Sequence, residues 1–147
     1  MENNITYKKL ETKEEISMAK ELIMEYVKWL NMDLTFQDID NELRNFPSKY
    51  KSPDGEFIIA KENNIIIGCV AIKKLENKIC EMKRLFVKDE YKMKSVGKKL
   101  VEKIIEEAKL KNYEKIRLDT LNTMEAALKL YYKNGFYEIE PYYSRCT

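Results

Sequence analysis

The sequence contains no histidine, and this absence excludes several kinds of active site. Histidine is the base of the common serine and cysteine triads and a frequent zinc ligand. Histidine-based triads and histidine-ligated zinc sites are therefore excluded. Cysteine is also scarce, because Cys69, Cys80 and Cys146 are the whole supply and form no C-x-x-C pair. Their odd number argues against a disulfide scaffold or a four-cysteine zinc site and favours a reducing compartment. Cys69 lies in an apolar run and is predicted to be a core residue.

Long apolar runs are missing too, since none approaches the roughly 20 residues that cross a bilayer. The N-terminus, Met-Glu-Asn-Asn, has neither a basic segment nor an apolar segment typical of a signal peptide. The net charge of +2 is too small to favour nucleic-acid or membrane binding as the main activity. We therefore expect a cytoplasmic protein that binds neither nucleic acid nor membrane. Its 147 residues, 44% hydrophobic and 35% charged, fit a single domain spanning 1–147.

Hydrophobic periodicity and turn residues predict the order β-α-α-β-β-β-α-β-α-β. The predicted strands are 5–9, 57–61, 65–74, 79–87, 115–119 and 136–143. The predicted helices are 16–30, which follows a capping box at 12–15, then 35–46, 96–108 and 123–133. A polar loop is predicted at 91–95. Parallel crossovers occur only in the second half of this order, so we expect a mixed sheet with helices on both faces.

A strand, a basic loop and a helix start follow one another in the middle of the chain. The strand ends with Leu85, Phe86 and Val87, and the loop and first helical turn contain Lys92, Met93, Lys94, Ser95, Val96, Gly97 and Lys98. Backbone N–H groups at a helix N-terminus lack internal partners and carry about half a positive charge, so such a loop can bind pyrophosphate. A glycine lets the ligand approach the backbone closely. The alternative is an ordinary, solvated basic helix start.

This loop resembles the R/Q-x-x-G-x-G/A motif found at the same junction in the GNAT acetyltransferase superfamily. The corresponding residues are Lys92-x-x-Ser95-x-Gly97, with Lys in place of Arg or Gln and Ser in place of the first Gly. The stretch 130–138, which contains Tyr131, is similar to the L-Y-x-x-x-G-F signature of that superfamily. Further stretches at 33–37, 80–87 and 117–120 resemble a subgroup of small, uncharacterised bacterial N-acetyltransferases.

The resemblance implies an α+β fold with three α/β/α layers, in which helices flank a mixed central sheet. It also implies transfer of an acetyl group from acetyl-CoA to a primary amine of a small molecule, amino acid or peptide. Leu85, Phe86 and Val87 would separate from the neighbouring strand and bind the pantetheine amides. One of their N–H groups would polarise the acetyl carbonyl. No metal or second cofactor is needed.

Amine acetylation requires a base for the acceptor nitrogen and an acid for the departing thiolate. Glu81 lies on a strand expected to be central, where an unpaired charge is costly. By resemblance, it matches the catalytic glutamate of the histone-acetylating branch, and Tyr131 matches the tyrosine that often protonates the thiolate. The alternative for Glu81 is a salt bridge to Lys83 or Arg84. The alternative for the whole protein is a weakly active or inactive CoA-binding or regulatory module with the same fold.

Members of the subgroup usually have one more strand after the P-Y-Y sequence, whereas this chain stops at Thr147. That strand normally lies between those matching 115–120 and 136–143, so its loss would expose unpaired backbone groups on both. We therefore expect the strand 136–143 either to move over and pair directly, or to be exchanged between two subunits. The exchange would give a symmetric homodimer.

Overall fold

A computed structural model of the chain describes residues 4–30, 44–46, 50–51 and 53–118. For residues 29, 30 and 92–94 the description covers the backbone alone. The elements along the chain are β1 (Ile5–Lys9), α1 (Lys13–Leu30), β2 (Glu56–Glu62), β3 (Ile65–Glu76), β4 (Ile79–Val87), the 3₁₀ helix η3 (Asp89–Lys94), α3 (Val96–Leu110) and β5 (Lys115–Arg117).

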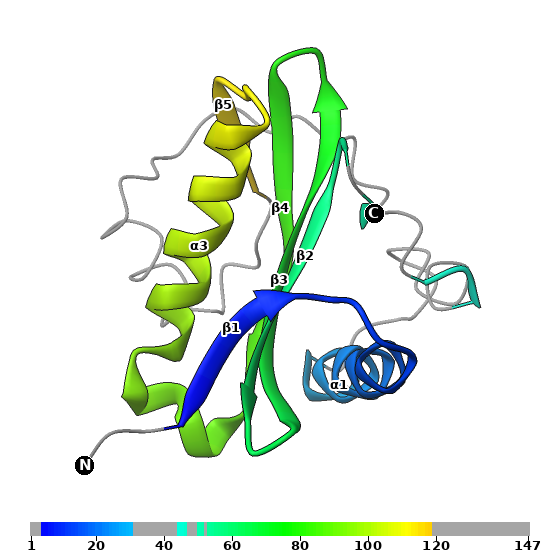
Figure 1. The fold of residues 1–147 in the computed structure, drawn as a ribbon, viewed down its shortest axis with the longest axis vertical. Helices are drawn as coiled ribbons and strands as arrows, with labels where there is room; N and C mark the ends of the chain where they lie inside the picture. The colour runs from blue at the N-terminus through cyan, green and yellow to red at the C-terminus, as the bar shows by residue number, and fades with distance from the viewer. Residues whose placement is uncertain (1–3, 31–43, 47–49, 52, 119–147) are drawn as a thin grey trace.

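Within the described residues, the strands form one sheet in the order β1-β2-β3-β4-β5. The first four pair antiparallel, and β5 pairs parallel to β4. Short turns can join antiparallel neighbours, whereas the parallel step needs a crossover, which α3 provides. Figure 1 shows α1 on one face of the sheet and α3 on the other. The predicted mixed sheet, with helices on both faces, is confirmed.

Two cores fill the spaces between the sheet and the helices. The α3-side core contains Ile67, Val70 and Ile72 of β3 under Leu100 and other residues of α3. The α1-side core contains alternate residues of the same strands under α1. The alternation explains the long apolar run in β3, because a strand buried on both faces needs hydrophobic residues at successive positions.

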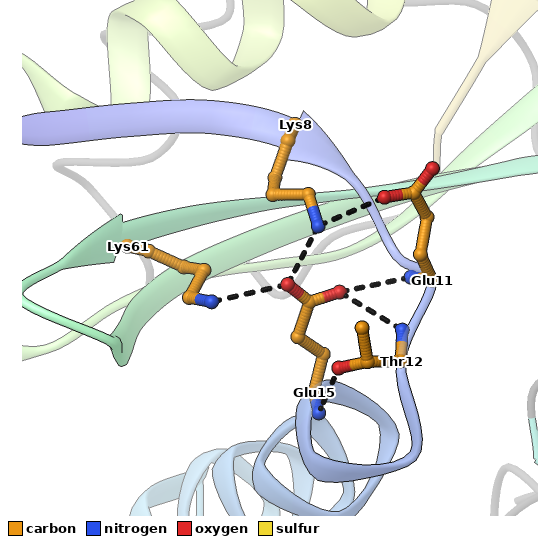
Figure 2. A network of polar contacts seen from close by, with 5 residues as sticks. All are labelled: Lys8, Glu11, Thr12, Glu15 and Lys61. Carbon is orange, nitrogen blue, oxygen red and sulfur yellow. Dashed lines mark hydrogen bonds and ion pairs between the residues drawn. The ribbon is translucent and has the colours of Figure 1, made fainter.

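Helix α1 begins with the predicted capping box, which is confirmed and extends into a larger polar network (Figure 2). The Glu15 N–H donates to Thr12 Oγ1 at 3.1 Å, and the Thr12 N–H donates to Glu15 Oε1 at 3.1 Å. Glu15 Oε2 accepts from Lys8 Nζ at 2.6 Å and from Lys61 Nζ at 3.0 Å. A carboxylate that is 3% exposed therefore joins β1, α1 and β2.

The strands predicted at 5–9 and 79–87 are confirmed with the same bounds, and the hairpin at 57–74 is confirmed with slightly longer strands. The polar loop predicted at 91–95 is wrong, since η3 occupies Asp89–Lys94. Of the helix predicted at 35–46, only residues 44–46 are described. The elements expected at 123–133 and 136–143 lie outside the described residues, and so does the strand exchange expected for a homodimer. Of the helices in the described ranges, none has the length and apolarity to cross a membrane.

Both described cysteines are buried and unbridged, as predicted for Cys69. Cys69 is 1% exposed and belongs to the α1-side core, whereas Cys80 is 0% exposed and belongs to the α3-side core. Burial raises the pKa of the Cys80 thiol to about 12. Cys146 lies outside the described residues.

The Glu15 network predicts an acid-sensitive contribution to stability. Burial alone would raise the pKa of Glu15, but hydrogen bonds from Lys8, Lys61 and two backbone N–H groups outweigh it and lower the pKa to about 2. A depressed pKa stabilises the folded state above the ordinary value of 4.5, and this stability is lost as the pH falls towards 2. Glu15→Gln should therefore lower the free energy of unfolding at pH 7 by about 2–3 kcal/mol.

Urea unfolding of Glu15→Gln between pH 7 and pH 2.5 would measure both the loss and its pH dependence. Glu14→Gln is the matched control, since Glu14 is the exposed neighbour in the same helical turn. Equal losses in both variants, or an unchanged acid transition in Glu15→Gln, would contradict the role of the network.

Candidate active site

An irregularity in β4 sets the geometry of the candidate site. Cys69 of β3 pairs with Phe86, but Ala71 pairs with Lys83, so β4 contains one extra residue in this interval. Arg84 lies at the extra position with φ of 61°, a left-handed conformation that is uncommon for a residue with a side chain. The Cys69 thiol donates a hydrogen bond to the Arg84 carbonyl at 3.1 Å. These features identify a β-bulge.

The bulge reverses which residues of β4 face each helix. Before it, Cys80 and Met82 belong to the α3-side core; after it, Leu85 and Val87 pack on that side. Phe86 belongs to the α1-side core, where its ring lies 5.0 Å from that of Tyr26. The candidate pantetheine-binding residues therefore divide between the two faces, with Leu85 and Val87 towards α3 and Phe86 towards α1.

Glu81 lies on β4 just before the bulge and is 1% exposed. Its Oε1 is 3.8 Å from Lys73 Nζ and 3.9 Å from Lys83 Nζ. The ion pair with Lys83 considered from the sequence is confirmed, while Lys73 was missed. Lys73 is the cross-strand partner of Glu81 in β3, and only the register reveals this neighbour. Two ammonium groups within 4 Å therefore offset part of the cost of burying this carboxylate.

Parallel pairing of β4 with β5 covers Ile79–Glu81 and ends with β5 at Arg117. Glu81 is thus the last residue of β4 in this pairing, and the strand continues for six residues to Val87. The predicted separation of Leu85–Val87 from a neighbouring strand involves residues after Leu118, outside the described part of the chain, and it stays a prediction.

The loop after β4 leads through η3 into α3. The Lys88 N–H donates to the Ile67 carbonyl at 2.9 Å, and the Tyr91 N–H donates to the Lys88 carbonyl at 2.9 Å. The two helices are separated by Ser95, whose φ of 62° and ψ of 19° are left-handed. Ser95 is the N-cap of α3, but its side chain makes no capping hydrogen bond. This N-cap therefore lacks the side-chain hydrogen bond that usually accompanies the position.

The starts of α1 and α3 differ in how their N–H groups are satisfied. In α1, Thr12 and Glu15 bind them from within the chain. In α3, helix geometry leaves the N–H groups of Val96, Gly97 and Lys98 without intrahelical partners, and the first turn has no acidic residue. This arrangement fits a pyrophosphate, which would bind the N–H groups and interact favourably with the helix dipole.

Gly68 of β3, which the sequence reasoning missed, allows the end of β4 and the start of α3 to approach each other. A Cβ at this position would lie 3.1 Å from the Phe86 carbonyl oxygen, 3.1 Å from Leu100 Cδ1 and 3.4 Å from Val96 Cγ1. The two 3.1 Å distances are tighter than ordinary contacts, so a side chain would force Leu100 or the Phe86 backbone to shift by a few tenths of an ångström. A glycine inside an apolar strand is a sequence signal for such a close approach.

The structure therefore joins most of the predicted site residues along one continuous path. Leu85, Phe86 and Val87 end β4, and Ser95, Val96, Gly97 and Lys98 begin α3. Lys92, Met93 and Lys94 lie between them in η3, where only the backbone is described. Tyr131 lies outside the described residues.

Comparison with known proteins supports a single family. The model of the acetyltransferase (GNAT) family matches residues 21–136. An uncharacterised N-acetyltransferase from Schizosaccharomyces pombe is 38% identical over 96% of this chain and 88% of its own length. A GNAT-family acetyltransferase from Staphylococcus aureus has a TM-score of 0.81 and 28% identity, covering 92% of this chain and 86% of that one. The PaiA N-acetyltransferase from Thermoplasma acidophilum, solved with coenzyme A, has a TM-score of 0.72 and 25% identity, covering 93% and 92%.

The left-handed Ser95 predicts that glycine would be the better residue at this position. Glycine adopts positive φ readily, whereas a side chain there costs about 1–2 kcal/mol. After subtracting the greater entropy that glycine loses on folding, Ser95→Gly should stabilise the protein by about 0.5–1 kcal/mol. Ser17→Gly, at an exposed position inside α1, should instead destabilise it by about 0.5 kcal/mol. Urea unfolding of both variants measures whether the free energy of unfolding changes with opposite signs. Destabilisation by Ser95→Gly would contradict the left-handed conformation of Ser95.

Proposed function

The chain belongs to the acetyltransferase (GNAT) family, and we propose that it transfers an acetyl group from acetyl-CoA to a primary amine. The acceptor would be a small molecule, an amino acid or a peptide. The observation that carries the proposal is the continuous path from the bulged strand β4 to the start of α3. This path begins at the bulge at Arg84, where the regular register between β4 and β3 is interrupted, and leads to a helix N-terminus that its own side chains do not cap.

In this proposal, acetyl-CoA lies along that path. The backbone of Leu85, Phe86 and Val87 would bind the amides of the pantetheine arm, and one N–H group would polarise the acetyl carbonyl. The N–H groups of residues 93–98 would bind the pyrophosphate. Gly97 supports this assignment, because a residue without a side chain lets a phosphate approach the first turn of α3.

Glu81 is the proposed general base for the acceptor amine. The amine must lose a proton before or during attack on the thioester, and a carboxylate can accept that proton directly or through water. Lys73 and Lys83 place two ammonium groups within 4 Å of the Glu81 carboxylate. Tyr131 is the proposed acid, because a phenol with an ordinary pKa of about 10 can protonate a departing thiolate. The assignment of Tyr131 comes from the resemblance of its sequence context.

A second candidate function is a CoA-binding module without acetyl transfer. The Glu81 ion pairs favour this second function. Pairing with Lys73 and Lys83 is a structural reason for a buried glutamate at this position, so no catalytic role is needed to explain it. Both candidates predict CoA binding, so only turnover separates them. Release of the CoA thiol in the presence of a panel of amines, amino acids and peptides would support the enzyme. Binding of CoA without thiol release by any of these acceptors would support the module.

The proposed phosphate site predicts a charge-dependent affinity for CoA. Reversing two charges in η3, as Lys92→Glu/Lys94→Glu, should weaken binding by about tenfold or more at low salt, because both changes place negative charge beside the pyrophosphate. Titration calorimetry at low and high ionic strength measures the effect. The control is Lys13→Glu/Lys28→Glu, which changes the net charge equally at exposed positions of α1. Unchanged affinity in the η3 variant would locate the phosphate site elsewhere.

The role of Glu81 predicts a selective loss of turnover. Glu81→Gln should lower kcat/KM for the amine by about 10²-fold and flatten the rise of rate with pH, because the proton acceptor is removed. Affinity for CoA should not change. Glu76→Gln is the matched control, since Glu76 forms an exposed ion pair with Arg117 at 3.2 Å. Wild-type kinetics with a lowered Tm in Glu81→Gln would make this residue a structural ion-pair member.

A further inference from the structure

A side-chain contact links the candidate phosphate loop to the end of strand β2. Tyr91, in the centre of η3, donates a hydrogen bond from its hydroxyl group to Glu62 Oε1 at the end of β2. The two residues are 29 positions apart in the sequence. A hydrogen bond from a phenol to a carboxylate is charge-assisted and stronger than a neutral one. This contact therefore holds η3 against strand β2.

Glu62 is a rigid anchor for this contact. It pairs with Ile5 of β1 on one side and with Ile65 of β3 on the other, so its backbone lies inside the sheet. The hairpin turn that follows has Asn63 and Asn64 at φ of 52° and 71°, as in the tight turns that match the twist of paired strands. The backbone that carries this acceptor therefore cannot shift without disturbing two strand pairings.

The loop needs such an anchor. A 3₁₀ helix has poorer hydrogen-bond geometry than an α-helix, and η3 ends at Ser95 in a left-handed conformation. The ring of Tyr91 packs against the α3-side core, its N–H binds the Lys88 carbonyl, and its hydroxyl binds Glu62. Tyr91 is therefore fixed at both ends of its side chain and at its backbone. The hydrogen bond to Glu62 raises the pKa of Tyr91, which keeps the phenol a donor at neutral and mildly alkaline pH.

We propose that Tyr91 is a positioning residue for acyl-CoA binding, which acts by holding η3 on Glu62 so that the N–H groups of residues 93–98 face the pyrophosphate. This inference rests on the proposed function. Preorganised donors bind an anion more tightly because the cost of ordering the loop is met before binding.

Tyr91→Phe tests the proposal with a minimal change, because the ring that packs on the core is kept. The dissociation constant for CoA and the KM for acetyl-CoA should rise about fivefold to tenfold, while kcat at saturating acetyl-CoA stays near the wild-type value. Tyr113→Phe is the matched control. Its hydroxyl donates to the Asp54 carbonyl at 2.7 Å beyond the other end of α3, so the same atom is lost away from the loop.

Variants of Glu62 test the acceptor of the same hydrogen bond. Glu62→Gln keeps an acceptor oxygen and removes the charge, so its affinity for CoA should equal or exceed that of the wild type. Glu62→Ala removes the acceptor and should reproduce the loss seen in Tyr91→Phe. The double variant Tyr91→Phe/Glu62→Ala should be no weaker than either single variant, because one interaction is lost in all three.

The outcomes separate this inference from the proposed function. Wild-type protein that does not bind CoA would overturn both. Wild-type binding that is unchanged in Tyr91→Phe and in Glu62→Ala would overturn the role of Tyr91 alone. Equal losses of affinity in Tyr91→Phe and Tyr113→Phe would assign the effect to general destabilisation and would also overturn it. A loss confined to Tyr91→Phe and Glu62→Ala, with affinity retained in Glu62→Gln, would support it.

Discussion

The extra residue in β4 is the constraint on which the candidate site depends. Without it, strict alternation would direct Phe86 towards α3 and Leu85 and Val87 towards α1, opposite to what is observed. The left-handed conformation of Arg84 costs about 1–3 kcal/mol, and surrounding contacts must offset it. The Cys69 thiol on the Arg84 carbonyl and the ring contact between Tyr26 and Phe86 are two of them. Both contacts come from elements already fixed by the core, so the bulge is held by the fold as a whole.

The helix starts on the two faces of the sheet differ in how their N–H groups are satisfied. At the start of α1, a buried carboxylate satisfies the helix and joins three elements, which leaves nothing there for a ligand. At the start of α3, neither the N-cap side chain nor an acidic residue in the first turn meets the N–H groups. Strand β2 contacts both regions. Its Lys61 binds Glu15 at the start of α1, and its Glu62 binds Tyr91 of η3. Two successive residues of β2 thus stabilise structures on opposite faces of the sheet, because neighbouring side chains of a strand point to opposite faces.

Local signals in the sequence were enough to predict the strands 79–87 and 5–9, the capping box and the start of α3, because turn residues and periodicity act over a few positions. The bulge was not predictable, since no glycine marks Arg84 and its conformation arises from pairing with β3. Lys73 was missed for the same reason, because it becomes a neighbour of Glu81 only through the pairing of β3 with β4. Tyr91 was assigned to a loop because its partner lies on a distant strand. The candidate site residues could therefore be named from the sequence and its resemblance to the family, whereas the contacts that orient them depend on tertiary structure.

The burial of the two described cysteines has a consequence for chemical selectivity. A thioester can pass its acyl group to any accessible thiolate, so reactive cysteines near acetyl-CoA would compete with the amine acceptor. With a pKa of about 12, Cys80 has a thiolate fraction of roughly one in 10⁵ at pH 7, and its side chain is closed off beneath α3. The Cys69 proton is engaged by the Arg84 carbonyl on the opposite face. Strands β3 and β4 can therefore lie beside a thioester without being acylated by it, and acetyl groups would not be lost to self-modification at these positions.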